Sequence, residues 1–330
     1  MEKNTKIFVA GHRGLVGSAL VRQLRASGYD NLLLRTHTEL DLTDRQAVDA
    51  LFEKERPDNI FLAAAKVGGI LANNSYPADF FRVNTAIALN VIDAAYRNRA
   101  ARLLFLGSSC IYPRECPQPI REEYLLTGPL EPTNSPYALA KIGGIEMCRA
   151  YNRQHGTNFL AVMPTNLYGL ADNYDLQNSH VLPALIRKMH EAKAASAEYV
   201  TVWGSGTPRR EFLFGDDLAE ACLFLMKLPQ VGFDALLTQK GAPALMNIGC
   251  GEDLTIRELA ETVKNAIGFR GALAFDTSKP DGPPRKLLDV SRMQSLGWEP
   301  RTPMSDGIRA AYGDFLARQT KSAGQDGAIH

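Results

Sequence analysis

Two short segments carry residue types suited to ketone–alcohol interconversion. One is Ser108-Ser109-Cys110, and the other places Tyr137 and Lys141 four residues apart, on one face of a helix. A lysine ammonium beside a tyrosine can lower the pKa of the phenol from about 10 toward neutrality. Such a phenol can exchange a proton with a carbonyl oxygen, and a serine hydroxyl can hydrogen-bond the same oxygen. The two segments therefore predict a site that works with a hydride carrier.

Cys110 is a residue that a plain reductase would not need. It lies two positions beyond Ser108 and adds a titratable thiol that can act as an acid or a base. A single cysteine is more often a buried structural thiol. Its position at the predicted carboxyl end of a strand favours a catalytic role, because doubly wound sheets bind ligands at that edge.

A glycine-rich loop near the chain start predicts a dinucleotide site. Residues 6–10 read as a short buried strand, glycines follow at positions 11, 14 and 17, and a helix-spaced apolar run continues to about residue 27. This spacing lets the backbone approach a pyrophosphate at a helix N-terminus, where amides and the helix dipole favour the anion. Glycines also serve plain turns, but the strand–loop–helix context favours the dinucleotide.

The second strand, predicted at residues 31–34, indicates which dinucleotide binds. An NAD site usually has an acid about 20 residues past the glycines, bound to the ribose 2′-hydroxyl. Here Arg35 follows the strand with no acid at its tip, and Arg13 lies inside the glycine loop. Arginine binds phosphate in a planar fork, so we expect NADP, with Asp41 and Leu42 near the adenine. In the alternative, Arg35 is only a solvated charge.

Strand and helix signals alternate through the first half of the chain. Further strands are predicted at residues 59–64, 102–107 and 159–163, and helices at 77–98 and 135–155, the latter with Ser135 as N-cap and Pro136 at its first position. Repeated β-α-β units predict an α/β fold with a doubly wound parallel sheet, a Rossmann domain.

The pattern changes after residue 169. A polar loop covers 170–180, and helical or strand-like segments follow at 181–195, 201–203, 246–248 and 255–267, with an extended cationic loop at 279–286. We predict a Rossmann domain over 1–169 with a return segment at about 212–250. A smaller α/β substrate domain would consist of about 170–211 and 251–317, and 318–330 would form a flexible tail.

Composition favours a soluble enzyme. The chain has 330 residues and a net charge of +1, which gives no indication of nucleic acid or a membrane as partner. No apolar run reaches the roughly 18 residues of a spanning helix, and the first strand begins almost at Met1, so we expect no leader. The five cysteines are odd in number and scattered. They favour reduced thiols in the cytoplasm over disulfides or a metal site.

Six segments together resemble the extended short-chain dehydrogenase/reductases of the nucleotide-sugar branch, and within it the GDP-L-fucose synthase family. The resemblance covers about residues 5–316. The glycine loop and Tyr-x-x-x-Lys mark only the superfamily, whereas Ser-Ser-Cys, Ala-Ala-Lys-Val-Gly-Gly and Asn-Ser-His are more specific. The segments are 11–17, 63–70, 107–113, 136–141, 163–169 and 279–282.

The resemblance implies an enzyme that uses NADP(H) and a GDP-sugar. It would invert C3″ and C5″ of GDP-4-dehydro-6-deoxy-D-mannose and reduce the C4″ ketone to give GDP-L-fucose. Both inverted carbons flank the ketone, so each inversion passes through an enolate and needs a proton removed on one face and returned on the other. Cys110 and His180 are the candidate acid/base groups, and Ser108 and Tyr137 would stabilise the enolate oxygen.

The resemblance also assigns residues to each part of the site. The catalytic residues would be Ser108, Cys110, Tyr137, Lys141 and His180. Substrate contacts would come from Lys188, Trp203, Arg210 and Asp281, although Trp203 alone could be a core aromatic and His180 alone an ordinary loop histidine. The cofactor-binding residues would be Gly11, His12, Arg13, Gly14, Leu15, Val16, Gly17, Arg35, His37, Asp41, Leu42, Leu106, Gly107, Ser108, Ser109, Lys141, Pro164, Thr165, Asn166, Leu167 and His180.

Two positions depart from the family pattern. His37 stands where bacterial members commonly have arginine, which weakens the argument for a 2′-phosphate. Phe214-Gly215 precedes the acidic pair at 216–217, where the family usually has histidine and valine. The second departure concerns local packing rather than chemistry.

Other readings of the same motifs remain open. A 4,6-dehydratase would be expected to place a glutamate beside Cys110, where this chain has none, and a 4-epimerase would show no net NADPH use. A non-catalytic NADP-sensing protein would tend to lose Tyr137 or Lys141. We also expect a homodimer, because related enzymes pair the helices predicted at 77–98 and 135–155 across a two-fold axis.

Overall fold

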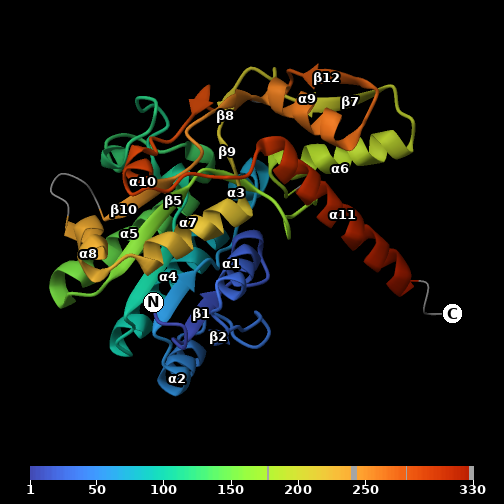
Figure 1. The fold of residues 1–330 in the computed structure, drawn as a ribbon. Coiled ribbons are helices and arrows are strands. Elements are labelled where there is room, and N and C mark those ends of the chain that lie inside the picture. Colours follow the sequence, from blue (N-terminus) through green and yellow to red (C-terminus); the bar gives the residue numbers. More distant parts are fainter. Residues whose placement is uncertain (177, 239–243, 280, 327–330) are drawn as a thin grey trace.

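The computed structural model describes residues 1–176, 178–238, 244–279 and 281–326, and it has the predicted doubly wound α/β fold (Figure 1). Six parallel strands form the central sheet in the order β10-β5-β4-β3-β1-β2. Their bounds are Ile7–Ala10 (β1), Leu32–Leu33 (β2), Asn59–Leu62 (β3), Arg102–Leu106 (β4), Phe159–Pro164 (β5) and Leu245–Ile248 (β10).

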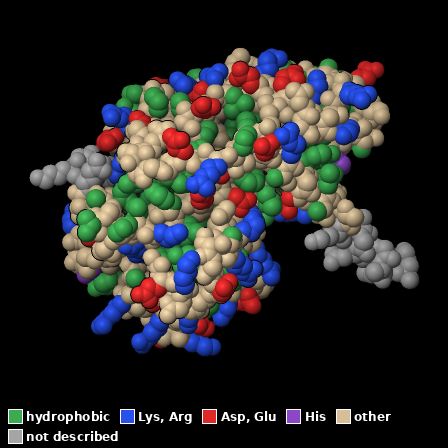
Figure 2. Space-filling view, in the orientation of Figure 1, with side chains coloured by type: hydrophobic (Ala, Val, Ile, Leu, Met, Phe, Trp, Pro, Cys, Tyr) green, Lys and Arg blue, Asp and Glu red, His purple; other side chains and the backbone are tan. Residues whose placement is uncertain are grey.

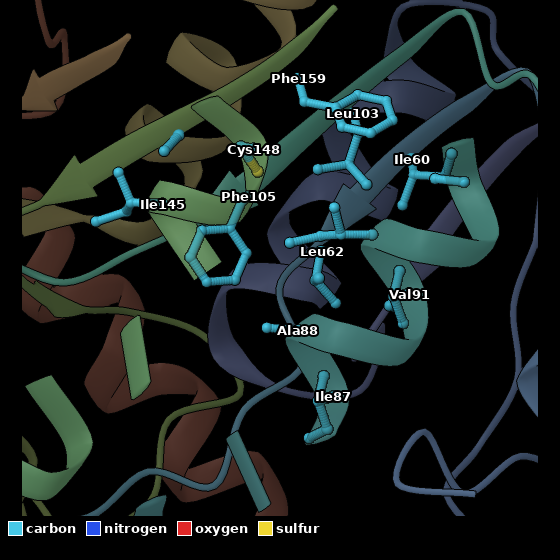
Figure 3. Close-up of a cluster of buried hydrophobic side chains, with 14 of the residues drawn as sticks. Ile60, Leu62, Ile87, Ala88, Val91, Leu103, Phe105, Ile145, Cys148 and Phe159 are labelled. Atoms are coloured by element: carbon cyan, nitrogen blue, oxygen red, sulfur yellow. The ribbon is translucent and has the colours of Figure 1, made fainter. Parts of the chain in front are cut away.

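Helices cover both faces of this sheet because successive strand residues point to opposite sides. Ile60 and Leu62 belong to one buried cluster, whereas Phe61 between them belongs to another. The first cluster lies under α2, α4 and α5 (Figure 3), and the second under α1, α7 and α8. The helix bounds are Leu15–Ala26 (α1), Arg45–Glu55 (α2), Pro77–Arg97 (α4), Ser135–His155 (α5), Gly215–Lys227 (α7) and Gln230–Thr238 (α8).

The later segments build smaller sheets and a third buried cluster. The additional strands are Asn166–Tyr168 (β6) beside Phe212–Phe214 (β9), Tyr199–Trp203 (β7) beside Ala272–Asp276 (β12), and Arg209–Arg210 (β8) between Leu254–Thr255 (β11) and Arg285–Lys286 (β13). The additional helices are Ile70–Ser75 (α3), Val181–Ala194 (α6), Ile256–Ile267 (α9), Ser291–Ser295 (α10) and Met304–Asp326 (α11). Three short 3-10 turns cover Ser109–Ile111 (η1), Glu122–Tyr124 (η2) and Pro132–Asn134 (η3). The proposed division into two domains stays a prediction.

Two expectations about helix ends need correction. The N-cap of α5 is Asn134 and not Ser135, because η3 runs directly into α5 and Ser135 already has helical backbone angles (φ −56°, ψ −39°). At the other end of the chain, α11 continues to Asp326, past the predicted start of the tail at 318. Helix-forming residues without proline occupy this stretch; residues 327–330 lie outside the described part.

The departure at Phe214-Gly215 has a packing explanation. A Cβ on Gly215 would lie 2.9 Å from Cδ2 of Leu15, so glycine permits α7 and α1 to pack closely. The ring of Phe214 packs 5.6 Å from that of Tyr168.

Basic and acidic side chains are interspersed on the face shown in Figure 2, in agreement with the small net charge. Among the described helices, none is by itself long and apolar enough to cross a membrane; α7 and α8, bent by 104° at their junction, pass that test only as a pair.

Candidate active site

A cavity of about 590 Å³ brings together residues that lie far apart in the sequence. Its size is that of a small-molecule site. The predicted catalytic and substrate-binding residues that line it are Cys110, His180, Lys188, Trp203, Arg210 and Asp281, and Ser109, predicted to contact the cofactor, lines it too. Asn166 and Leu167, predicted to contact the cofactor, line it as well.

Ser108, Tyr137 and Lys141 are set by two adjacent elements. Ser108 follows β4 in extended conformation and its hydroxyl accepts a hydrogen bond from the Cys110 backbone N–H at 3.4 Å. Tyr137 and Lys141 lie one turn apart on α5, as predicted, and the Lys141 Nζ is 5.8 Å from the Tyr137 ring centroid. The Nζ donates a hydrogen bond to the Leu106 carbonyl at 2.7 Å. The ammonium is thereby fixed at the carboxyl end of β4.

The pKa of Tyr137 shifts in the opposite direction from the one predicted. Burial raises the pKa of the phenol, the nearby Cys110 adds to the rise, and a hydrogen bond with Ser108 opposes it. Burial also lowers the pKa of Lys141, to about 8. Both shifts follow because low-dielectric surroundings disfavour the charged form. The protein surroundings therefore favour the protonated phenol of Tyr137, which can act as a proton donor.

Cys110 is buried in η1 beside two cations. Burial raises the pKa of its thiol, while Lys286, the Ser108 hydroxyl and Lys141 oppose that rise. A positive charge near a thiol stabilises the thiolate. Cys110 is thus a thiol for which nearby charges partly offset the cost of ionisation, and it lies next to Tyr137.

His180 is the N-cap residue of α6 and faces the same cavity. The protein around its ring and the charge of Lys286 lower its pKa, which favours neutral imidazole. Lys286 therefore acts on both candidate acid/base groups, since it favours the Cys110 thiolate and disfavours the His180 imidazolium. The sequence analysis saw Lys286 only as part of a cationic loop; its place beside β8 in β13 could not be found from spacing.

Trp203 is not a core aromatic. Its side chain is 55% exposed, and two ammonium groups lie over its ring, Lys188 at 4.9 Å and Lys279 at 5.6 Å from the centroid. An exposed indole at a cavity mouth offers a flat surface for a base or a ring.

Arg210 and Asp281 both line the cavity and carry opposite charges that interact. Burial lowers the pKa of Arg210 and the Asp281 charge opposes this. The Asp281 carboxylate accepts hydrogen bonds from the Ser205 backbone N–H (2.7 Å) and hydroxyl (2.8 Å). Asp281 thus links its own loop to the loop that contains Ser205. Each of its carboxylate oxygens still has a lone pair that can accept a hydrogen bond from a ligand.

The glycine loop has the shape that a dinucleotide needs. Gly11 has φ +84°, and a Cβ there would lie 2.8 Å from the Ala64 backbone, while a Cβ on Gly17 would lie 2.0 Å from the Gly11 carbonyl oxygen. Gly14 is the N-cap of α1 and no side chain caps that end. The N-terminal amides of α1 can therefore bind a pyrophosphate. His12 Nδ1 is buried in this loop without a hydrogen-bond partner.

The tip of β2 differs from the prediction in two respects. Arg35 is engaged, because it donates to the Leu34 carbonyl at 2.8 Å and pairs with Glu55 at 3.4 Å. An acid does stand nearby, since the Glu39 carboxylate accepts hydrogen bonds from Thr36 and its pKa is lowered by them and by Arg35 and Arg13. A turn after β2 returns Glu39 toward the strand tip, which residue spacing did not indicate. Arg13 itself is exposed.

The remaining predicted cofactor residues take several positions. Asp41 accepts hydrogen bonds from Thr43 at 2.8 Å, and Leu42 is buried in the core. Thr165 and Asn166 donate to the backbone carbonyl of Glu211 at 3.2 and 2.8 Å. Glu211 is a fully buried carboxylate that the sequence analysis did not single out.

Comparison with known proteins identifies the family of the chain. The model of the NAD dependent epimerase/dehydratase family matches residues 7–248. A protein of Arabidopsis thaliana named putative GDP-L-fucose synthase 2 is 57% identical, over 96% of this chain and 93% of its own length. The GDP-L-fucose synthase of Escherichia coli strain K12 is 52% identical, over 97% of this chain and 99% of its own.

A solved structure is similar over nearly the whole fold. It is described as a GDP-L-fucose synthetase from Naegleria fowleri bound to NADP. Its TM-score is 0.87 at 29% sequence identity, and the match covers 97% of this chain and 95% of that one.

Proposed function

The chain belongs to the NAD dependent epimerase/dehydratase family, and from this we propose that it converts GDP-4-dehydro-6-deoxy-D-mannose into GDP-L-fucose. The reaction combines epimerisation at C3″ and C5″ with NADPH-dependent reduction at C4″. The observation that carries the proposal is the pairing of two acid/base groups, Cys110 and His180, in one cavity beside the Ser108–Tyr137 hydroxyls. A simple ketoreductase would need only the hydroxyls.

Epimerisation uses the hydroxyl pair as an oxyanion hole. Ser108 and Tyr137 donate hydrogen bonds to the C4″ oxygen, which acidifies the protons on C3″ and C5″. Cys110, whose ionisation Lys286 assists against the effect of burial, exchanges a proton on one face of the sugar. His180 exchanges a proton on the other face. Each inversion leaves the ketone unchanged for the next step.

Reduction uses the same oxygen site. The glycine loop would hold NADPH, which would supply the hydride for C4″ when bound. Tyr137 donates its proton to the C4″ oxygen, in keeping with the protonated phenol that burial favours. Lys141, fixed by the Leu106 carbonyl, stabilises the tyrosinate that is left.

The nucleotide end of the substrate would occupy the rest of the cavity. Arg210 provides a guanidinium for the diphosphate. Trp203, with Lys188 over its ring, provides a platform for the nucleoside, and Asp281 can accept a hydrogen bond from a hydroxyl.

A substrate panel tests the proposal. NADPH oxidation should occur with GDP-4-keto-6-deoxymannose and be at least about tenfold slower with UDP- or dTDP-4-keto sugars, because differential binding decides kcat/KM. Turnover of a different nucleotide sugar, or epimerisation without net NADPH oxidation, would favour another enzyme of the same family.

We predict a preference for NADPH over NADH that depends on Arg13. Replacing Arg13 by serine should reduce the ratio of kcat/KM for NADPH over NADH by on the order of tenfold, because a charged hydrogen bond to the 2′-phosphate is lost. Arg25→Ser, an exposed arginine on α1, is the control and should leave the ratio unchanged. Equal efficiency of the wild-type protein with both cofactors would contradict the prediction.

We also propose a homodimer formed through α4 and α5. Some apolar residues of these two helices, among them Phe80, Val91 and Ile145, are buried within the chain and are not available to a partner. Phe81, Leu89 and Leu139 remain 46%, 47% and 47% exposed on these two helices, so both helices offer apolar side chains to a second copy of the chain.

Light scattering checks the dimer. Twice the chain mass of 36.2 kDa is expected at micromolar concentration, and Leu139→Glu should shift the protein toward monomer because a charge would be buried at the interface. Val231→Glu, at an exposed position on α8, should not. A wild-type monomer would refute the proposal.

A further inference from the structure

One corner of the cavity contains three buried oxygen atoms that have no hydrogen-bond partner. They are Oδ1 of Asn73, Oδ1 of Asn134 and Oγ of Ser179, and all three residues line the cavity that holds Cys110 and His180. Buried polar atoms are nearly always paired, so three unpaired ones at a single place point to a missing partner.

The three side chains meet around α3. Asn73 lies on α3 itself, and η3, which ends at Asn134, packs against that helix. Gly69, the N-cap of α3, donates a hydrogen bond to the Asn178 carbonyl at 3.2 Å. A Cβ on Gly69 would lie 3.1 Å from the carbonyl oxygen of Ser179. Three segments distant in sequence thus bring the oxygens to one wall.

The hydrogen bonds around Asn73 identify its free atom as an acceptor. Its Nδ2 donates to the carbonyls of Gly68 at 2.8 Å and Gly69 at 3.0 Å, which uses both amide protons and leaves Oδ1 without a partner. Asn73 is only 6% exposed. Asn134 is the N-cap of α5, yet its side chain caps no backbone N–H, so its oxygen is also left for another donor.

The chemistry of these atoms selects hydroxyl groups. The two amide oxygens only accept hydrogen bonds, the hydroxyl can both accept and donate, and none carries a charge, so together they suit a hydroxyl better than a phosphate or a carboxylate. The sugar of the proposed substrate has only two hydroxyls, on C2″ and C3″. Ser179 immediately precedes His180, which places the corner beside the carbons that are inverted.

We propose that Asn73, Asn134 and Ser179 form a subsite that accepts hydrogen bonds from the C2″ and C3″ hydroxyls of the sugar. The inference rests on the proposed function for the identity of that sugar. The C3″ hydroxyl changes its position when C3″ inverts, and acceptors on separate segments can hold it before and after. Because the oxygens are shielded from bulk water, each such bond is strengthened.

Binding of GDP-mannose, which carries both hydroxyls and does not react, tests the subsite without requiring turnover. Ser179→Ala and Asn134→Ser should each raise the Kd for GDP-mannose about threefold to tenfold, the effect of one lost neutral hydrogen bond. With the analogue that lacks both hydroxyls, GDP-2,3-dideoxymannose, the variants and the wild type should bind with the same Kd. A merely structural effect would weaken both ligands equally.

Asn74→Ser is the matched control for Asn134→Ser, because Asn74 neighbours Asn73 on α3 but is exposed and does not line the cavity. It should leave both Kd values unchanged. An equal loss of affinity for both ligands, or no loss for GDP-mannose, overturns the subsite. A wild-type protein that binds GDP-mannose with the expected variant pattern but turns over no GDP-4-keto sugar overturns only the proposed function.

Discussion

Replacing Tyr137 by phenylalanine should stop NADPH oxidation while proton exchange at C3″ and C5″ continues. The phenol is the proton donor for the C4″ oxygen, and loss of a general acid lowers a rate by about 10²- to 10⁴-fold. Cys110 and His180 stay in place, so deuterium from heavy water should still enter both carbons. The exchange should be slower, because the enolate oxygen keeps Ser108 but loses one of its two donors.

The substitution is small in its effect on packing. Phenylalanine keeps the ring that meets Phe80 edge to face, with centroids 6.1 Å apart. Mass spectrometry of the sugar measures deuterium uptake, and absorbance at 340 nm measures NADPH. Tyr199→Phe, at an exposed position on β7, is the control for loss of a phenol. If Tyr137→Phe oxidises NADPH at the wild-type rate, the proton comes from another group.

The fold could be predicted because the sequence is locally consistent. Each predicted strand of the central sheet is present within two residues at either end, from the short apolar run at β1 to the buried run at β5. Apolar period and glycine placement determine these elements before any long-range contact forms. The ends of the elements were harder to predict. The start of α5 depends on η3, and no local sequence signal shows that this turn leads directly into the helix.

The site could be predicted only in part, because two kinds of information are absent from spacing. Motifs that lie at strand ends, such as Ser108 and Cys110, follow from topology. Lys286 and Asn73 reach the cavity from β13 and from the short helix α3. The placement of these elements depends on long-range contacts, such as the pairing of β13 with β8. Electrostatic direction was also beyond reach, since burial and not the lysine decides the pKa of Tyr137.

The ribose end of the cofactor site illustrates the same limit. Arginine is a residue type that favours a 2′-phosphate, and Arg35 and Arg13 both lie near the ribose end. However, Arg35 forms an ion pair with Glu55 at 3.4 Å. Of these two arginines, Arg13 is exposed and is the one left for a 2′-phosphate. The preference for NADPH is therefore tested by replacing Arg13.

Replacing Cys110 by serine should nearly abolish epimerisation and spare binding. A serine hydroxyl has almost the shape of the thiol but a pKa far above the thiol's usual value of about 8.5, so it cannot take a carbon-bound proton near neutral pH. We expect deuterium uptake at C3″ and C5″ to fall by about 10²- to 10⁴-fold, the range for loss of a general base. His180→Gln should also impair epimerisation, since it removes the acid/base group on the opposite face.

Cys116→Ser is the matched control, because Cys116 also lies near Lys286 but does not line the cavity. It should exchange deuterium at the wild-type rate. Tyr137→Phe and Cys110→Ser then fail in opposite half-reactions, since the first loses reduction with exchange retained and the second loses exchange with the C4″ clamp intact. If Cys110→Ser exchanges as fast as wild type, Cys110 is a packing residue. Another group would then have to remove the protons from C3″ and C5″.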